Sequence, residues 1–468
     1  MEDHYFGAIK PNVLRFMQDL DTQLFRLGIP AKTRHNEVSP NQFEIACIYE
    51  EANLAIDHNL QLMDIIKNVA DQQDLVASLY EKPLAGVNGS GKHLNWSMGD
   101  NTGVNYLEPS KSPIKNLTFL MTVGAILLGV KKYGGLLRAS VADAGNDHRL
   151  GANEAPPAII SVYLGEYLDG ILNDIAGSGK FTEKKMADIN LGVQNLPKVA
   201  KDTSDRNRTS PLAFTGNKFE FRAVGSTHNC SEPATIMNMI VAYGFEEIYN
   251  SLKNKKGDVK ENAFLVLKDV FKKTESVRFE GDNYTASWHS EAKKRGLPND
   301  KNTPKALRRM IAKESIALFE KYGILSKQEL ESKVEIKLEA YNKIKDIELK
   351  TALTITNTQV LPALAEYLGI LASSASSVNA CGIKASSLLE DVKTCDKIYG
   401  DIKKAAANLE KIITTCEKET DLFKEADTFS EKGEDSLNKL RTVVDKAETV
   451  IMADLWPMAT YQDLLLKL

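Results

Sequence analysis

The chain has 468 residues, of which 43% are apolar and 26% are charged. This length is typical of two or three domains, and the apolar content excludes global disorder. Lys and Arg number 59 against 63 Asp and Glu, a formal net charge of −4. We therefore expect no broad electrostatic surface for nucleic acid or for an anionic membrane.

Cysteine usage and the apolar runs indicate the compartment. The five cysteines are widely spaced and form no CxxC pair, which disfavours a disulfide scaffold and a cysteine-built zinc site. The acidic start of the chain lacks an apolar signal core. The longest apolar run, residues 117–130, is too short to span a bilayer and predicts a buried helix. We expect a soluble, cytoplasmic protein.

Residues 1–305 predict a domain of mixed helices and strands. An amphipathic helix carries Val13, Phe16, Leu20, Leu24 and Leu27 on one face and ends at Gly28. Further helices are expected at about 51–69 and 233–252. Alternating residues predict strands at 43–47 and 218–222. Strands and helices without a regular β-α-β rhythm indicate an α+β fold.

Residues 306–468 predict a helical region. Glycine becomes sparse there, and Lys, Glu, Ala and Leu dominate. Two narrow apolar stripes with helical spacing indicate antiparallel helix packing. Their members are Ile402, Ala405, Leu409, Ile412 and Cys416, then Leu437, Leu440, Val444, Ala447 and Ile451.

Two segments offer metal ligands. On a strand over 218–222, Lys218, Glu220 and Arg222 share one face. That face is either solvated or lines a cavity with a metal-binding carboxylate between two cations. Glu37 and Glu44 flank the turn signal Pro40-Asn41, and a turn there could bring both to one side for Mg²⁺ or Mn²⁺. The alternative is two surface glutamates.

The segment 86–93, GVNGSGKH, nearly matches a phosphate-binding P-loop. His93 stands where that motif needs Ser or Thr, and the residues that follow alternate like a strand instead of opening a helix. We therefore predict a glycine loop with exposed amides, followed by a strand that presents His93, Asn95 and Ser97 on one face.

Two loops add charges for a substrate. Residues 148–157 contain Arg149 and Glu154 beside one glycine and two prolines. Residues 205–208 contain Arg206 and Arg208, whose forked guanidinium groups suit phosphate or carboxylate. A surface loop and a surface salt-bridge cluster are the alternatives.

Taken in order, these segments resemble the catalytic domain of glutamine synthetase, and more closely the type III enzymes. The stretches that carry the resemblance are KTRHNEVSPNQFE, AGVNGSGKHLNWS, GANEAPPA, DRNRTSPLAFTGNKFEFRAVGS and LWPMATYQDLL. The resemblance implies an antiparallel sheet with flanking helices over 1–305 and an all-helical region over 306–468. It also implies the ATP-dependent ligation of ammonia to glutamate through γ-glutamyl phosphate.

By the same resemblance, Mg²⁺ or Mn²⁺ ions and ATP assist the reaction. The implied metal ligands are Glu37 and Glu44 for one ion, and His93 and Glu220 for the other. The implied glutamate site contains Asn88, Gly89, Arg149 and Arg222, and the nucleotide site contains Asn95, Ser97, Arg208 and Lys218. The implied catalytic residues are Glu154, Arg149 and Arg208. Arg149 and Arg222 would hold the substrate carboxylate and the transferring phosphate, and Arg208 would meet the phosphates of ATP. Glu154 would lie on a flap and take a proton from ammonium. A homo-oligomer of stacked rings is expected.

The sequence departs from the family pattern at three places. Ala213 stands where many members have another arginine five residues after Arg208, and Arg149 and Glu154 are five residues apart where better-known types have six. The family's Glu-x-Glu strand and small β-domain do not precede His35. Each metal site is therefore expected to be one carboxylate short.

The missing metal-binding carboxylates leave other interpretations open. One is a truncated, inactive glutamine-synthetase-like chain, and another is a helical assembly module with a vestigial site. A guanidino-phosphotransferase is disfavoured by the NGSGKH and NEAPP segments, and a P-loop ATPase by His93.

Overall fold

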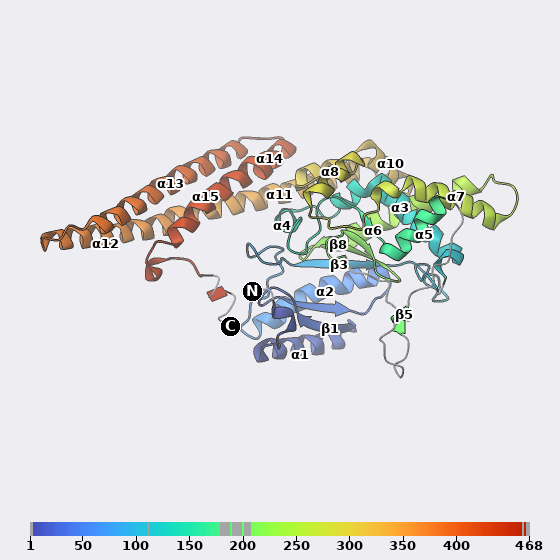
Figure 1. Cartoon of the computed structure of the whole chain (residues 1–468), viewed down its shortest axis with the longest axis horizontal. Helices are drawn as coiled ribbons and strands as arrows, with labels where there is room; N and C mark the ends of the chain where they lie inside the picture. The colour runs from blue at the N-terminus through green and yellow to red at the C-terminus, as the bar shows by residue number, and fades with distance from the viewer. Residues whose placement is uncertain are drawn as a thin grey trace. The chain divides into compact units, whose positions relative to one another are not determined.

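A computed structural model describes residues 3–110, 112–177, 188–189, 199–200, 207–460 and 463–464. The chain divides into two compact units (Figure 1). The first contains Met1–Lys301 and Ala306–Lys327, and the second contains Asn302–Lys305 and Gln328–Leu468. The domain boundary at residue 305 stays a prediction.

The first unit mixes helices and strands, as expected. In chain order its elements are α1 (Pro11–Arg26), β1 (Ala31–Asn36), β2 (Phe43–Cys47), α2 (Ala52–Asp71), β3 (Gly91–Trp96), α3 (Leu117–Ala139), α4 (Ala144–Arg149), β4 (Val162–Tyr163), α5 (Glu166–Ala176), β5 (Asp188–Ile189), β6 (Val199–Ala200), β7 (Leu212–Phe214), β8 (Phe219–Gly225), α6 (Ser231–Leu252), α7 (Val259–Lys273), α8 (Ala286–Lys294) and α10 (Lys313–Lys321). Helix α9 (Thr303–Met310) spans the division between the units.

An apolar cluster holds the β1–β2 hairpin against the first two helices. Its buried members come from α1, α2 and the segment between α1 and β1, and they are Leu20, Leu24, Ile29, Leu62, Ile65 and Val69. Ile45 of β2 packs against them. The prediction that Leu27 shares the buried face of α1 is wrong, since it is 57% exposed. The helix ends at Arg26, so Leu27 lies in the turn that precedes Gly28.

The central sheet has the strand order β3-β8-β7-β4. It is antiparallel except at its edge, where β4 pairs with β7 in parallel. Every residue of β8 is buried, as expected of a strand with neighbours on both sides. The strand predicted after the glycine loop is confirmed as β3, so the segment 86–93 does not open a helix as a P-loop does.

The apolar run 117–130 forms part of α3, which packs on α6 (Figure 1). Helix α3 is long and apolar enough to cross a membrane by length and composition, and 78% of its most apolar window is buried inside the protein. A core helix meets the same criteria as a membrane span. The burial of α3 agrees with the predicted buried helix.

The second unit is helical, with α11 (Lys327–Ile355), α12 (Leu361–Ala380), α13 (Ser386–Cys416), α14 (Leu422–Thr428) and α15 (Glu434–Glu448). Helix α13 packs on α12 and on α15. The predicted stripe on α13 is only partly right, because Ala406 and Ile413 are buried where Ala405 and Ile412 were expected. A straight helix has 3.6 residues per turn, so a spacing of alternating threes and fours drifts off its face.

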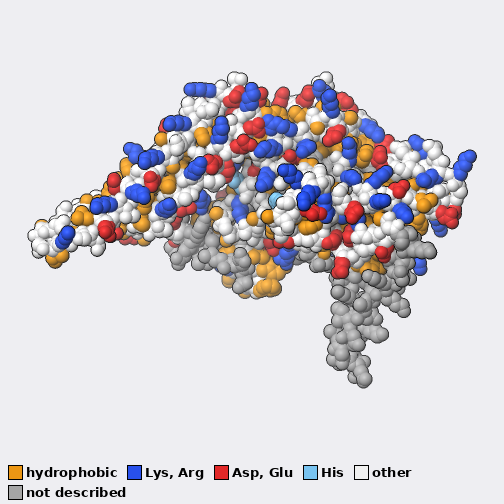
Figure 2. Space-filling view, turned by 45° about the horizontal axis from the view of Figure 1, so that its top comes forward, with side chains coloured by type: hydrophobic (Ala, Val, Ile, Leu, Met, Phe, Trp, Pro, Cys, Tyr) orange, Lys and Arg blue, Asp and Glu red, His pale blue; other side chains and the backbone are white. Residues whose placement is uncertain are grey.

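The surface carries both signs of charge. Basic and acidic side chains are interspersed over the face drawn in Figure 2. This distribution is in line with the near-balance of charges in the sequence. All five cysteines are free thiols, as expected for a chain without a disulfide scaffold.

Candidate active site

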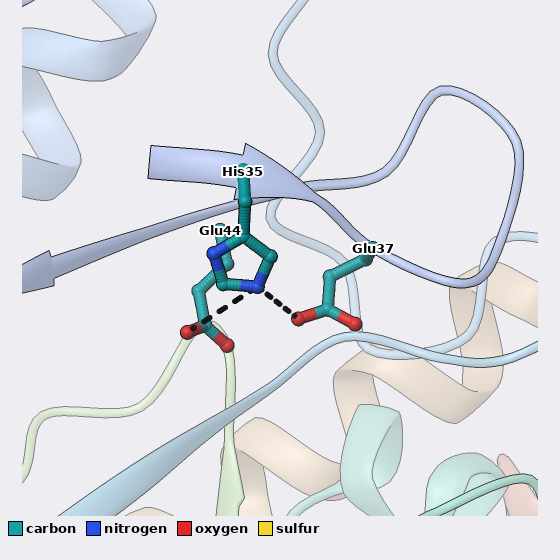
Figure 3. A group of neighbouring side chains, drawn as sticks. All are labelled: His35, Glu37 and Glu44. Carbon is teal, nitrogen blue, oxygen red and sulfur yellow. Dashed lines mark hydrogen bonds and ion pairs between the residues drawn. The ribbon is translucent and has the colours of Figure 1, made fainter. Parts of the chain in front are cut away.

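The β1–β2 hairpin brings Glu37 and Glu44 to one side, together with His35 (Figure 3). The strands are antiparallel, and His35 lies directly opposite Glu44. Asn41 adopts the left-handed conformation (φ 56°) in the connecting turn, and the Glu37 amide donates to the Gln42 carbonyl over 2.8 Å. The turn predicted at Pro40-Asn41 therefore makes neighbours of two carboxylates that are seven residues apart.

This group has the donor set of a divalent cation site. His35 Nε2 lies 3.2 Å from Glu37 Oε1 and 3.9 Å from Glu44 Oε1, and the candidate ligand atoms all lie within 4.8 Å of one another. Burial raises the pKa of Glu37, and the charge of Glu44 raises it further. A cation between these carboxylates would relieve their repulsion. Two carboxylates and an imidazole fit Mg²⁺ or Mn²⁺, so the residues present suit the metal that the sequence implied.

The second predicted metal pair meets across β3 and β8. His93 Nδ1 lies 2.6 Å from Glu220 Oε1, and Asn95 is paired with Glu220 in the register of the two strands. Arg222 Nε lies 3.6 Å from the same Glu220 oxygen. Glu220 and Arg222 are only 5% and 3% exposed. The alternative of an ordinary solvated sheet face is therefore wrong for these two residues.

The other predicted site residues on or next to these two strands lie closer to solvent. Lys218 is half-buried in the turn before β8 and not on the strand itself. Asn95 is exposed on β3, and Ser97 is exposed just after the strand ends. Their predicted place in a nucleotide site stays a prediction.

Two predicted site residues from different loops converge on the carboxylate of a third, Glu154. Glu154 Oε1 accepts a hydrogen bond from Arg208 Nη1 over 2.7 Å, and Oε2 accepts one from Asn88 Nδ2 over 3.2 Å. Asn153 and Glu154 both have positive φ, 52° and 66°. Such conformations are uncommon for residues with a side chain and mark strained segments at functional sites. The strained loop is consistent with the flap expected there. Arg206 lies outside the described residues.

Arg149 is buried against the central sheet instead of lying on a surface loop. It is 5% exposed, and its guanidinium donates to the carbonyls of Arg222 (3.2 Å) and Val224 (3.4 Å). Burial lowers its pKa to about 10, while the nearby carboxylate of Glu81 raises it. Even so, Arg149 keeps its charge at neutral pH. It therefore supplies a fixed cation next to β8.

Two glycines paired across β3 and β8 make room for this buried pair of charges. Gly91 lies opposite Gly225. A Cβ on Gly91 would overlap the guanidinium of Arg149, and a Cβ on Gly225 would come within 2.6 Å of Glu81 Oε1. The glycine loop is expected to expose its amides, and the structure adds a steric reason for Gly91, its last glycine.

The hairpin and the glycine loop belong to one site. Gln42 Nε2 donates to the carbonyl of Gly89 (2.7 Å) and to Ser90 Oγ (3.0 Å). Glu37 also acts electrostatically on Arg208, which already bonds Glu154. Five segments that are far apart in the sequence therefore meet in the first unit.

The sequence is similar to known proteins over nearly the whole chain. The family model of the glutamine synthetase catalytic domain matches residues 3–140, and that of the glutamine synthetase C-terminal domain matches residues 263–379. The chain is 40% identical to a type-3 glutamine synthetase of Dictyostelium discoideum, covering 99% of this chain and 64% of that protein. It is 39% identical to a glutamine synthetase of Butyrivibrio fibrisolvens, covering 100% of this chain and 67% of that protein.

The chain belongs to the glutamine synthetase family. It also matches a glutamine synthetase of Bacteroides fragilis at 38% identity, over 99% of this chain and 65% of that protein. It thus spans about two thirds of the length of these curated relatives. Among solved structures, it aligns with one titled "Apo GmaS without ligand" at 17% identity and a TM-score of 0.46, over 74% of this chain and 66% of that one.

Some residues of this candidate site could not be predicted in the same way from the sequence. His35 has a local signal, because it stands two residues before Glu37. A second group, Glu81, Asp143 and His228, also brings its ligand atoms within 4.8 Å. Glu81 is 1% exposed and accepts a hydrogen bond from the Thr227 amide over 2.9 Å. No short pattern in the sequence points to this group.

The group of Glu81, Asp143 and His228 bonds to both α4 and the end of β8. Asp143 caps the N-terminus of α4 by accepting from the Asn146 amide over 2.8 Å, and it also pairs with His228. The His228 Nδ1 accepts from the Gly225 amide over 3.3 Å, so its Nε2 carries the proton toward Asp143. Helix α4 ends in Arg149, and β8 carries Glu220 and Arg222. This hydrogen-bonded group therefore fixes α4 against the end of β8.

Proposed function

We propose that this chain carries the catalytic site of an ATP-dependent glutamate–ammonia ligase. The observation that supports it best is the convergence on Glu154: Arg208 and Asn88 reach one carboxylate from two other loops. A surface loop and a surface salt-bridge cluster would have no reason to meet the glycine loop. The family resemblance supplies the reaction.

Two groups of side chains would hold the divalent cations. His35, Glu37 and Glu44 form one candidate site, and His93 with Glu220 forms the other. When bound, Mg²⁺ or Mn²⁺ neutralises phosphate oxygens during phosphoryl transfer. The choice between the two metals belongs to this proposal, as do glutamate, ammonia and ATP as substrates.

The arginines and the flap would perform the remaining steps. Arg149 and Arg222, both buried, would bind the carboxylate of glutamate and the transferring phosphoryl group, since guanidinium suits both anions. Arg208 would contact phosphate from the more exposed side. Glu154 would accept a proton from ammonium, after which ammonia displaces phosphate from γ-glutamyl phosphate. Closure of its loop would keep water from the acyl phosphate.

We further propose a cytoplasmic homo-oligomer built as stacked rings. This part rests on the resemblance and on the reduced cysteines alone. Sedimentation of the purified chain tests it, and a monomer at micromolar concentration would contradict it.

The ligase proposal is tested by phosphate release. Purified chain receives ATP, Mg²⁺ and ammonium with and without glutamate, and the same assay is run on Glu220→Ala. We expect glutamate-dependent release that the variant lacks. The proposal fails if glutamate has no effect in any oligomeric state, or if Glu220→Ala turns over at the rate of the unmodified chain.

A further inference from the structure

The hydroxyl of Tyr284 is a buried donor that the proposed function does not yet use. Its oxygen is shielded from solvent and has no hydrogen-bond partner among the described residues. A buried polar group without a partner costs free energy and calls for an explanation. Tyr284 lies between α7 and α8 in sequence, outside all five motifs of the site.

The segment that carries Tyr284 is fixed directly onto the active site. Asn207 donates from Nδ2 to the Gly281 carbonyl over 2.8 Å, and its own carbonyl accepts from Arg222 Nη1 over 2.8 Å. One residue therefore touches both the Tyr284 segment and a proposed substrate arginine. Asn207 also immediately precedes Arg208.

The neighbouring residue anchors the segment further. Asn283 is fully buried, and its amide donates to Thr209 Oγ1 over 3.0 Å. Its Oδ1 accepts from Ser161 Oγ over 2.9 Å. With Asn283 held on both sides, the position of Tyr284 is set by the fold and does not depend on a free loop.

Three of the charges that act on the phenol belong to the proposed substrate site. Burial raises the pKa of Tyr284 to about 12, and Arg222, Glu154 and Arg149 act on it electrostatically together with the neighbouring Asp282. The phenol therefore stays neutral and keeps its proton at physiological pH. A neutral O–H group whose segment is bonded, through Asn207, to Arg222 can donate to an anion that the arginines bind.

We propose that Tyr284 contacts the substrate and that its hydroxyl donates a hydrogen bond to an anionic oxygen held by Arg149 and Arg222. This inference rests on the proposed function. The oxygen belongs either to the glutamate carboxylate or to the transferring phosphoryl group, which share this chemistry. A substrate in place would also give the hydroxyl the partner that it lacks among the described residues.

Tyr284→Phe tests the inference because it removes only the hydroxyl. We expect kcat/KM for glutamate or for ATP to fall by roughly 10- to 100-fold, as for loss of a hydrogen bond to a charged group. The substrate whose KM or binding changes identifies the anion. The matched control is Tyr322→Phe, which removes a hydroxyl that already donates to Glu246 (3.0 Å) and should leave both constants unchanged.

A second measurement separates contact with substrate from a structural role. Removing an unpaired buried hydroxyl should leave the thermal midpoint of the free protein unchanged or raise it. Inorganic phosphate and glutamate are then titrated into both forms by calorimetry. At least tenfold weaker binding of one of them to Tyr284→Phe supports the inference.

The outcomes distinguish this inference from the ligase proposal. If the unmodified chain lacks glutamate-dependent turnover, the ligase proposal fails and the calorimetry alone decides on Tyr284. Equal affinities of both forms for both ligands overturn the inference, and so does the absence of binding to the unmodified chain. Unchanged kinetics in an active Tyr284→Phe overturn it as well.

Discussion

Arg208 and Glu154 form an ion pair with an N–O distance of 2.7 Å. The pair joins the segment before β7 to the strained loop after α4, and Asn88 bonds the other oxygen of the same carboxylate. Both partners are well exposed, with 52% and 36% of their side chains accessible. An exposed pair contributes little to folding, about 0–1 kcal/mol. We therefore expect the pair to position the carboxylate of Glu154, the proposed proton acceptor, more than to stabilise the fold.

Glu154→Gln should separate these two roles. The variant keeps the shape of the side chain but cannot accept a proton, so we expect turnover to fall by about 10²–10⁴-fold. The free energy of unfolding should change by less than about 1 kcal/mol. Glu291→Gln is the control, since Glu291 on α8 pairs with Arg295 outside the candidate site, and it should keep full activity. Near-normal turnover of Glu154→Gln, measured as phosphate release, would remove Glu154 from the chemistry.

His35→Ala should weaken binding of a divalent cation. The imidazole completes the group with Glu37 and Glu44, so its loss should lower Mn²⁺ affinity by roughly tenfold or more. His58→Ala is the control, since His58 pairs with Glu50 outside this group. Mn²⁺ titration followed by paramagnetic resonance measures both. Equal affinities of the two variants would exclude His35 from the metal site.

Gly91→Ala should disturb the site through Arg149. The new methyl group would overlap the guanidinium, which is buried and bonded to the carbonyls of Arg222 and Val224. A shift of about 1 Å in such a group can cost about 10²-fold in rate. We expect kcat/KM for glutamate to fall at least roughly tenfold. If kinetics and thermal midpoint both stay unchanged, Arg149 has room to move and is not the fixed cation inferred above.

The local part of this site could be predicted from the sequence, and the long-range part could not. Glu37 with Glu44 follows from a turn signal, and the face shared by Glu220 and Arg222 follows from strand periodicity. The partnership of Arg149 with Glu81 depends on two glycines on different strands. Nothing near Tyr284 in the sequence reveals that its segment docks on Asn207.

The same distinction holds for the fold. The alternation at 43–47 predicts a strand with the same bounds as β2, and the apolar run at 117–130 predicts a helix that is part of α3. The stripe on α13 was placed one residue off at two positions, because small differences in periodicity accumulate along a helix of 31 residues. Pairing of β4 with β7 in parallel requires contacts that no short pattern encodes.

The crossing of α3 and α6 should be intolerant of extra volume. A Cβ on Gly244 would overlap the carbonyl oxygen of Ala125, a backbone atom that cannot turn aside. Gly244→Ala should therefore lower the free energy of unfolding by about 1–3 kcal/mol or more. Gly170→Ala on α5, with nothing within 4 Å of its Cβ, should raise it by about 0.5–1 kcal/mol. Urea unfolding measures both, and equal signs for the two variants would contradict the close helix crossing.

The carboxyl group of Glu280 should make the folded chain less stable as pH rises from about 4.5 to above about 7. Burial raises its pKa to about 7 from the ordinary 4.5, although the Leu164 amide donates to its Oε1 over 3.1 Å. Between these two pH values the folded chain holds a proton that the unfolded chain has released. The contribution of Glu280 to stability is therefore full below about pH 4.5 and is lost as pH rises through about 7.

Glu280→Gln removes this titration and keeps the oxygen that accepts from Leu164. Relative to the unmodified chain, the variant should gain roughly 1–2 kcal/mol of unfolding free energy between pH 5 and pH 8, after allowance for partial solvent screening. Other titrating groups contribute equally to both proteins, so the difference between their urea-unfolding curves isolates this residue. A difference that stays constant from pH 5 to pH 8 would show that Glu280 ionises normally in the folded chain. A difference that grows in favour of the unmodified chain would mean that its carboxylate is stabilised, and that Arg278 outweighs burial there.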